Sequence, residues 1–248
     1  MYINNIHIIS YIAVVLLGLI EGQFIDWCNQ RLSNHEKVFT KEFFSEYLKR
    51  LKPKYILMII VALINAGLLY KFNFTLSFFK YIVLAPMLIS AFCIDYKLQI
   101  IPNRLTLTIF ETGLIFTFLN VIINTNLGIT TLTNSLLGMF VGGGVFLLIT
   151  LIGGAIAGKE AMGFGDVKLM AALGLYFGTI NIGIISVISF LLAAIISVGI
   201  LIVKKKGFND YIPFGPFIVV ASSIVMFTPF SLLLKILLTI FTLGMYKG

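Results

Sequence analysis

NIGIISVISFLLAAIISVGILIV, residues 181–203, contains no charged residue. A helix crosses the hydrocarbon core of a bilayer with about 20 apolar residues, so this stretch predicts a transmembrane helix. Seven further apolar stretches predict spans near residues 6–25, 55–72, 76–94, 105–124, 134–157, 167–179 and 213–230. The stretch 167–179 is short for a full crossing and predicts a half-helix or a tilted helix. The tail 231–247 is apolar around Lys235 and predicts either a ninth element or an interfacial helix.

Composition excludes a soluble protein. Hydrophobic residues make up 59% of the 248 residues, and the mean hydropathy is +1.05. Charged residues make up 11%, against roughly 25% in a soluble domain. We therefore predict an all-α class, a polytopic integral membrane helix bundle with about eight transmembrane helices and a range of seven to nine. One transmembrane domain would cover residues 1–248.

The positions of the basic residues predict an orientation. Lysine and arginine gather in the polar breaks at 26–54, 95–104, 158–168 and 204–211, whereas the breaks near 125–132 and 179–181 carry no charge. Under the positive-inside rule the basic breaks are cytosolic and both termini lie outside. Lys71 and Lys80, which flank an external turn, are exceptions. The net charge of +8 is therefore no sign of nucleic-acid binding, and the lipid bilayer is the expected surrounding.

The loop 26–54 is the sizeable cytosolic segment. Within it, residues 40–51 predict a short amphipathic helix at the membrane surface, with Phe43, Phe44, Tyr47 and Leu48 on one side. Cys28 and Cys93 are too few for a disulfide framework or a zinc site and are expected to fill apolar space.

The motif GFGDVKL, residues 163–169, places an acid beside two glycines. Gly163 and Gly165 allow the backbone to bend and to approach a neighbour closely. Asp166 follows at the expected start of a helix, where the helix dipole favours a negative charge. An ordinary helix cap after a glycine turn explains this motif equally well.

The motif IDYKLQIIPNRL, residues 94–105, places a second acid at the end of a span. Asp95 closes the apolar stretch, and Pro102 suits the first turn of the next helix. Taken alone, Asp95 would be a solvated cap. A carboxylate at the membrane edge is nevertheless costly unless it is paired, solvated or functional.

Together, the two acids predict a catalytic pair. Asp95 and Asp166 come from different helices and are both predicted at the cytosolic face, where two carboxylates in one cleft would share a proton. One carboxylate would then activate water while the other protonates the departing amine. This is the chemistry of peptide hydrolysis without a metal or a covalent intermediate.

Four motifs in order resemble the type IV prepilin peptidases, a leader peptidase/N-methyltransferase family of GxGD-type intramembrane aspartyl proteases. KEAMGFGDVKLMAALG and IDYKLQIIPNRL resemble the two catalytic motifs of that family. YIPFGPF at 211–217 resembles its Pro-Phe-Gly-Pro segment, and EGQFIDWCNQRL at 21–32 resembles, more loosely, the segment that ends its first span.

The resemblance implies an aspartic endopeptidase of the bacterial plasma membrane, with Asp95 and Asp166 catalytic and facing the cytoplasm. Prepilins or pseudopilins would be its substrates, cut after a glycine at the end of a short basic leader. Around the pair, the supporting residues of the motifs would be Gly163, Gly165, Lys168, Pro102 and Asn103. Lys168 either biases the pair electrostatically or snorkels to the interface.

The resemblance also suggests residues for a substrate path and for methyl transfer. Pro213, Gly215 and Pro216 either line the path or start a helix. S-adenosylmethionine is the expected methyl donor if the new N-terminus is methylated. Candidate residues for that donor site are Glu21, Gly22, Asn29 and Arg31. We expect no metal, because the paired CxxC motifs of longer members are missing, and no cofactor for proteolysis.

Two other functions are considered. A cleavage-only, preflagellin-type peptidase would carry the same acids without methylating its product. A transporter could use two buried acids as a proton or cation relay, but it would favour acids near the midplane and inverted repeats.

Two further features have structural expectations. Glu160 is expected to be solvated, and Gly142, Gly143 and Gly144 are expected to pack helices.

Overall fold

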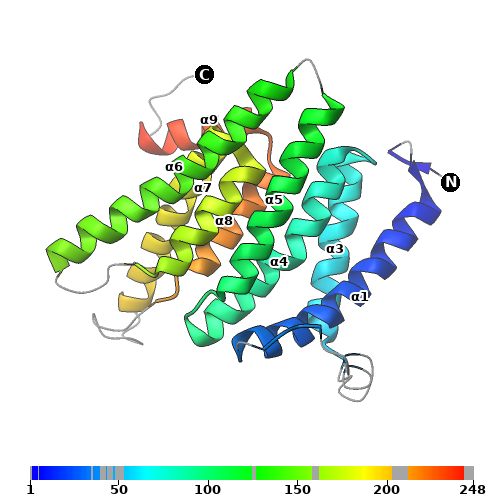
Figure 1. Cartoon of the computed structure of the whole chain (residues 1–248), viewed down its shortest axis with the longest axis horizontal. Helices are drawn as coiled ribbons and strands as arrows, with labels where there is room; N and C mark the ends of the chain where they lie inside the picture. The colour runs from blue at the N-terminus through cyan, green and yellow to red at the C-terminus, as the bar shows by residue number, and fades with distance from the viewer. Residues whose placement is uncertain are drawn as a thin grey trace.

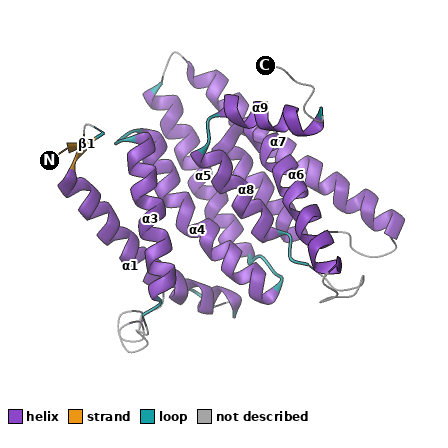
Figure 2. Cartoon of the chain, turned by 180° about the vertical axis from the view of Figure 1, so that it is seen from behind, coloured by secondary structure: helices purple, strands orange, loops and turns teal. Residues whose placement is uncertain are grey.

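The computed structural model describes residues 2–4, 6–34, 36–39, 43, 47, 53–124, 127–157, 162–202 and 212–242. A short antiparallel pair, β1 (Tyr2–Ile3) and β2 (Ile6–His7), precedes the first helix. The helices are α1 (Ile8–Ser33), α3 (Tyr55–Phe72), α4 (Leu76–Leu98), α5 (Asn103–Ile123), α6 (Gly128–Ala157), α7 (Phe164–Ile202), α8 (Gly215–Phe227) and α9 (Phe230–Phe241). The predicted all-α class is confirmed (Figure 2).

The helices are those of a polytopic membrane protein. Within the described ranges, α1 and α3 to α7 are long and apolar enough to cross a bilayer, while α8 and α9 are shorter. Large apolar side chains lie exposed on the outer faces, such as Ile56 at 78% and Ile156 at 83%. Such exposure is costly in water and is what a bilayer requires.

Helix α7 is a hairpin of two arms that meet at Gly178. This glycine has φ 75° and ψ 178°, which are not helical values. In a straight helix Met170 and Ile182 would lie about 18 Å apart. Here a Cβ on Gly142 of α6 would stand 2.5 Å from the Met170 carbonyl oxygen and 2.9 Å from Ile182 Cγ1. The arms therefore run side by side along α6, and they match the predicted spans 167–179 and 181–203.

Glycines allow α6 to approach α7 closely. Gly138 and Gly142 of α6 are four residues apart, as are Gly174 and Gly178 of α7. A Cβ on Gly138 would stand 2.5 Å from the Gly174 carbonyl oxygen. This is the small-residue packing that membrane helices use. The predicted packing role is confirmed for Gly142, which meets α7 backbone.

Two neighbouring glycines of α6 differ from Gly142 in their surroundings. A Cβ on Gly143 would stand 2.9 Å from the Ala171 side chain, so this position also packs helices as predicted. For Gly144 the prediction is wrong, because a Cβ there would meet nothing within 4 Å.

Helices α1 and α6 extend furthest beyond the predicted spans, and α4 also continues past residue 94 to Leu98. Helix α1 continues from about residue 25 to Ser33, because its polar end still packs inward, with Trp27 and Leu32 buried. Residues 26–33 thus belong to α1 and not to the loop. Helix α6 begins at Gly128 and not near 134. The hydroxyls of Thr131 and Thr133 donate to carbonyls one turn back, which keeps polar residues inside the helix.

The bundle has two distinct ends. The C-terminal ends of α1 and α4 lie with the N-terminal ends of α3, α5, α7 and α8 at one end, here called the site end. In Figure 1 this is the lower end, and α9 lies across the opposite end. The position of α9 favours the interfacial alternative for residues 230–241.

Lys71 and Lys80, the exceptions to the charge pattern, occupy helix ends. Lys71 Nζ donates to the carbonyl oxygen of Met226 in the last turn of α8, at 2.7 Å. Lys80 Nζ donates to the carbonyl oxygen of Tyr176, close to the end of the first arm of α7, at 2.8 Å. A cation at a helix C-terminus satisfies free carbonyls and complements the dipole.

Some predictions lie outside the described residues. The helix at 40–51 is described only at Phe43 and Tyr47, and Glu160 and residues 243–247 are not described. Phe43 and Tyr47 pack against Trp27 of α1, with ring centroids 5.8 Å away in both cases. These two rings therefore contact α1.

Candidate active site

Asp166 lies in the first turn of α7. The helix begins at Phe164, directly after the glycine of the motif, and the Asp166 N–H donates to the Gly163 carbonyl oxygen at 3.1 Å. The Asp166 side chain is 3% exposed. Its Oδ1 is buried and has no hydrogen-bond partner in the described part of the chain. The predicted helix start is confirmed, and the Asp166 side chain is buried there.

Gly165 sets how closely α7 approaches the turn before α5. A Cβ at this position would stand 3.1 Å from Ile101 Cβ, which is tighter than ordinary contact. The glycine thus brings the start of α7 against the Ile-Pro-Asn turn. Asp166, the next residue, is thereby held beside the segment that follows Asp95.

Asp95 lies in the last turn of α4 and is 4% exposed. The helix ends in Gln99, which has φ 56° and donates its N–H to the Asp95 carbonyl oxygen at 2.9 Å. The Asp95 carboxylate accepts a hydrogen bond at Oδ2 from the Gly215 N–H, 2.9 Å away. Because Gly215 begins α8, this carboxylate lies at the positive end of a helix dipole.

The two aspartates line one cavity at the site end. Its volume is about 380 Å³, large enough for a short stretch of polypeptide. The lining residues come from the end of α4, the following turn, the first residue of α5, and the start of α7 with the two residues before it. They are Asp95, Gln99, Ile100, Ile101, Asn103, Met162, Gly163, Phe164, Gly165, Asp166 and Lys168.

Four of the five supporting residues, all but Pro102, line this cavity. Pro102 stands before α5 and accepts the N–H of Leu105 at 3.0 Å, which fixes the helix start. Lys168 Nζ donates to Asn103 Oδ1 at 2.8 Å and lies 5.1 Å from the Phe164 ring centroid. This hydrogen bond joins the two motifs directly, which neither of the predictions for Lys168 included.

The three residues of the predicted substrate path separate into two groups. Gly215 touches the Asp95 carboxylate, but none of the three residues is among those lining the dyad cavity. Pro216 occupies the first turn of α8, so the helix-start alternative describes it well.

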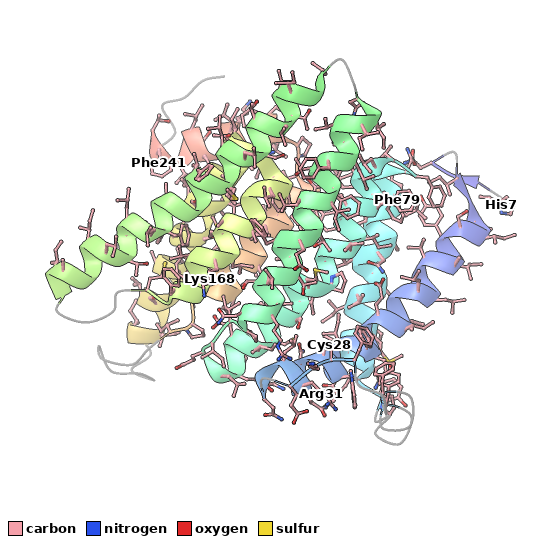
Figure 3. The ribbon with its side chains drawn as sticks, viewed as in Figure 1. His7, Cys28, Arg31, Phe79, Lys168 and Phe241 are labelled. Atoms are coloured by element: carbon pink, nitrogen blue, oxygen red, sulfur yellow. The ribbon has the colours of Figure 1, made fainter. Side chains whose placement is uncertain are left out.

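The four candidates for a methyl-donor site make contacts with different parts of the chain. Asn65 of α3 donates to the Glu21 carboxylate at 2.8 Å, and Gly22 packs against the Met58 backbone. Arg31 pairs with Glu36 at 3.3 Å near the end of α1 (Figure 3).

Asn29 is the candidate that faces a cavity. That cavity, of about 660 Å³, lies between α1, α3 and α4. Glu21, Gly22 and Arg31 are not among the residues that line this cavity, and the donor site stays a prediction. Among the described residues, no three His, Cys, Asp or Glu side chains gather where one metal ion could be held.

Gln99 is a cavity residue that the sequence reasoning missed. It lines the dyad cavity from the turn between α4 and α5. Its place in the sequence IDYKLQIIPN, between Asp95 and the Ile-Pro-Asn turn, could have indicated this role. A polar residue directly after a helix is commonly just a left-handed cap, so the pattern alone did not distinguish Gln99 from such a cap.

Comparison with known proteins shows that part of the chain is similar to one protein family. Residues 82–202 match the model described as the Type IV leader peptidase family, and this range holds both aspartates. The family resemblance seen in the motifs is thereby confirmed. The matched range runs from α4 to the end of α7, so Gly215 and α1 lie outside it.

Curated relatives of the leader peptidase family show the same likeness. The protein named prepilin leader peptidase/N-methyltransferase from Legionella pneumophila is 33% identical over 156 residues, which are 63% of this chain and 52% of the relative. Proteins of the same name from Aeromonas hydrophila and Xanthomonas campestris pv. campestris are 30% identical. Those matches cover 58% and 68% of this chain, and 48% and 56% of the relatives.

The chain thus spans about half the length of the leader peptidases it matches. No solved structure matches it.

Proposed function

We propose that this chain is an aspartyl endopeptidase that removes the leader of type IV prepilin-like proteins. The observation that carries the proposal is the shared cavity of Asp95 and Asp166, two buried acids from separate motifs. Buried acids that meet in a cleft are candidates for acid–base catalysis. The family match over residues 82–202 supports the same reaction class.

The surroundings of the two acids suggest their roles. Asp95 accepts an N–H from Gly215, a bond that stabilises its ionised form, whereas Asp166 Oδ1 is buried without a partner. In the proposed reaction, Asp95 takes a proton from water as the water oxygen bonds to the scissile carbonyl carbon. Asp166 gives its proton to the carbonyl oxygen. The C–N bond then breaks, its nitrogen receives the proton held by Asp95, and Asp166 regains its proton as the new carboxyl group forms.

The proposed substrate is a prepilin or pseudopilin whose basic leader precedes an apolar helix. Cleavage would follow the glycine at the end of the leader, at the cytosolic face of the bacterial plasma membrane. The described cations support this orientation, because Lys54, Lys97 and Arg104 lie at the site end. Lys71 and Lys80 at the opposite end are bonded to helix carbonyls.

Methylation of the new N-terminus is proposed as a second activity, with S-adenosylmethionine as donor. Its support is the name of the relatives, which includes N-methyltransferase. Of the predicted donor residues, Asn29 lines the cavity between α1, α3 and α4. Cleavage without methylation is the alternative outcome. The product mass separates the two.

A transporter is the weaker alternative. Asp95 and Asp166 lie in the last and first turns of their helices, at one end of the bundle. A relay across the membrane would place acids near the midplane.

The test combines the purified full chain with a prepilin-like substrate in vesicles. We expect a shortened product whose mass corresponds to cleavage after the leader glycine. An added methyl group on that product would support the second activity. An intact substrate, with the chain folded, would contradict the peptidase proposal.

A further inference from the structure

A second cavity adjoins the dyad cavity and shares two lining residues with it. Its volume is about 370 Å³, and its lining is mainly apolar. We call this cavity the lateral groove. Its lining residues come from the first turns of α5 and from the first arm of α7. They are Asn103, Thr106, Leu107, Phe110, Lys168 and Ala171.

The lateral groove lies between α5 and the first arm of α7, beside the place where α5 and α6 diverge. The two helices are close at their shared turn, where a Cβ on Gly128 would stand 3.1 Å from Val121. From there they separate toward the site end, in both views (Figures 1 and 2). Lys168 is seen between their ribbons in Figure 3, on the first arm of α7 that forms the floor. The residues that line the groove belong to α5 and α7, and none of them belongs to α6.

One hydrogen bond separates the lateral groove from the dyad. Asn103 and Lys168 line both cavities, and their side chains are bonded to each other at 2.8 Å. Both residues are exposed. A bond between exposed side chains is weak enough to open during binding.

Glu111 places a carboxylate on this face of α5. It is exposed and lies one turn beyond Leu107 on the same face. Its position is about 12 Å along α5 from the first residue of the helix. Within the described residues it takes part in no hydrogen bond or ion pair. A carboxylate facing the hydrocarbon core is costly, so a polar group of a partner is expected beside it.

We propose that the lateral groove receives the apolar helix of the substrate, and that the Lys168–Asn103 bond opens to admit the scissile peptide to the dyad. This inference rests on the proposed function. The groove is apolar, as the helix behind a leader is, and it ends at the active-site cavity. The substrate thus enters from the bilayer between α5 and α6.

The first test is photo-crosslinking in vesicles that hold the full chain and a helix-bearing prepilin substrate. A photo-reactive phenylalanine analogue replaces Leu107 in the groove or, as the control, Ile59 on α3. The two positions match, since each is the fifth residue of its helix and they are 55% and 53% exposed. The background is Asp166→Asn, which keeps the substrate uncut.

We expect a crosslink from position 107 to the apolar helix of the substrate and none from position 59. A crosslink from position 59 alone, or from neither, overturns the inference. A crosslink from position 107 only to lipid, or only to a second copy of the chain, also overturns the inference. It would identify lipid or the second copy as what occupies the groove.

A kinetic comparison separates this inference from the proposed function. In the active chain, Leu107→Trp fills the groove mouth and should raise KM about tenfold with kcat unchanged, while Ile59→Trp leaves both unchanged. If the wild type cuts the substrate and Leu107→Trp has wild-type KM, the groove assignment is wrong and the peptidase stands. If the wild type cuts nothing, both fail.

Discussion

Asp95 and Asp166 are held at one cavity by two different local structures. Asp166 is carried by the first turn of α7, and Gly165 lets that turn approach Ile101 closely. Asp95 closes α4 and is held from the far side by the N–H of Gly215, 120 residues later in the chain. At the scale of residues, the geometry of the pair therefore depends on two glycines as well as on the acids.

Gly215→Ala should lower cleavage strongly while the chain still folds. The new Cβ would stand 2.6 Å from Asp95 Oδ2 and 3.0 Å from its Cγ, so the carboxylate must move. Overpacking of this kind costs about 1–3 kcal/mol, and the same loss at the transition state corresponds to roughly 5- to 160-fold in kcat/KM. The control is Gly144→Ala, where a Cβ meets nothing within 4 Å. Equal activities of the two variants would show that the Asp95–Gly215 contact has no role.

The sequence predicts the acids well and their contacts poorly. Asp95, Asp166 and the glycines of the second motif stand out because few acids occur in so apolar a chain. The contact of Gly215 with Asp95 and the bond of Lys168 to Asn103 join segments 120 and 65 residues apart. No local pattern encodes such pairs. The roles of the site residues stay predictions.

At the scale of elements, α7 is the part that positions the site. Its first arm carries Asp166, and its second arm returns along α6 after the turn at Gly178. The sequence predicts both arms, since the break near residue 180 interrupts two apolar stretches. It predicts the edges of α1 and α6 less well, because hydropathy falls where polar side chains begin although helical hydrogen bonds continue.

Gly174→Ala should destabilise the α6–α7 pair. A Cβ at Gly174 would overlap the carbonyl group of Gly138, and backbone cannot move aside as a side chain can. We expect a loss of about 1–3 kcal/mol or more in detergent. The measurement is thermal unfolding, reported as a lower Tm. Gly183→Ala, on the second arm where nothing lies within 4 Å, should keep the wild-type Tm. A wild-type Tm for Gly174→Ala would refute the close packing.

At the scale of the whole molecule, charge separates the two ends of the bundle. Lys54, Lys97 and Arg104 lie at the site end. Lys71 and Lys80, at the opposite end, cap helix carbonyls. Lys235 of α9 is a further cation at the opposite end, so among the described residues the charge rule supports the proposed cytosolic site with three exceptions. The single domain over residues 1–248 stays a prediction.

Reporter fusions test the orientation. Alkaline phosphatase folds outside the cytosol, so a fusion after Asn124, at the end of α5, should be active. A fusion after Ala157, at the end of α6, should be inactive. The reverse pattern would place the dyad on the outer face and contradict the cytosolic assignment.

Substituting each acid separately tests whether cleavage needs both aspartates. Cleavage of a prepilin-like substrate in vesicles is measured for the wild type, Asp95→Asn, Asp166→Asn and the control Glu36→Gln, which alters a surface ion pair with Arg31. Asparagine keeps size and polarity but cannot carry the proton. We predict that both aspartate variants accumulate and cut nothing detectable, while Glu36→Gln cuts like the wild type. Substantial cleavage by either aspartate variant would contradict the two-aspartate mechanism.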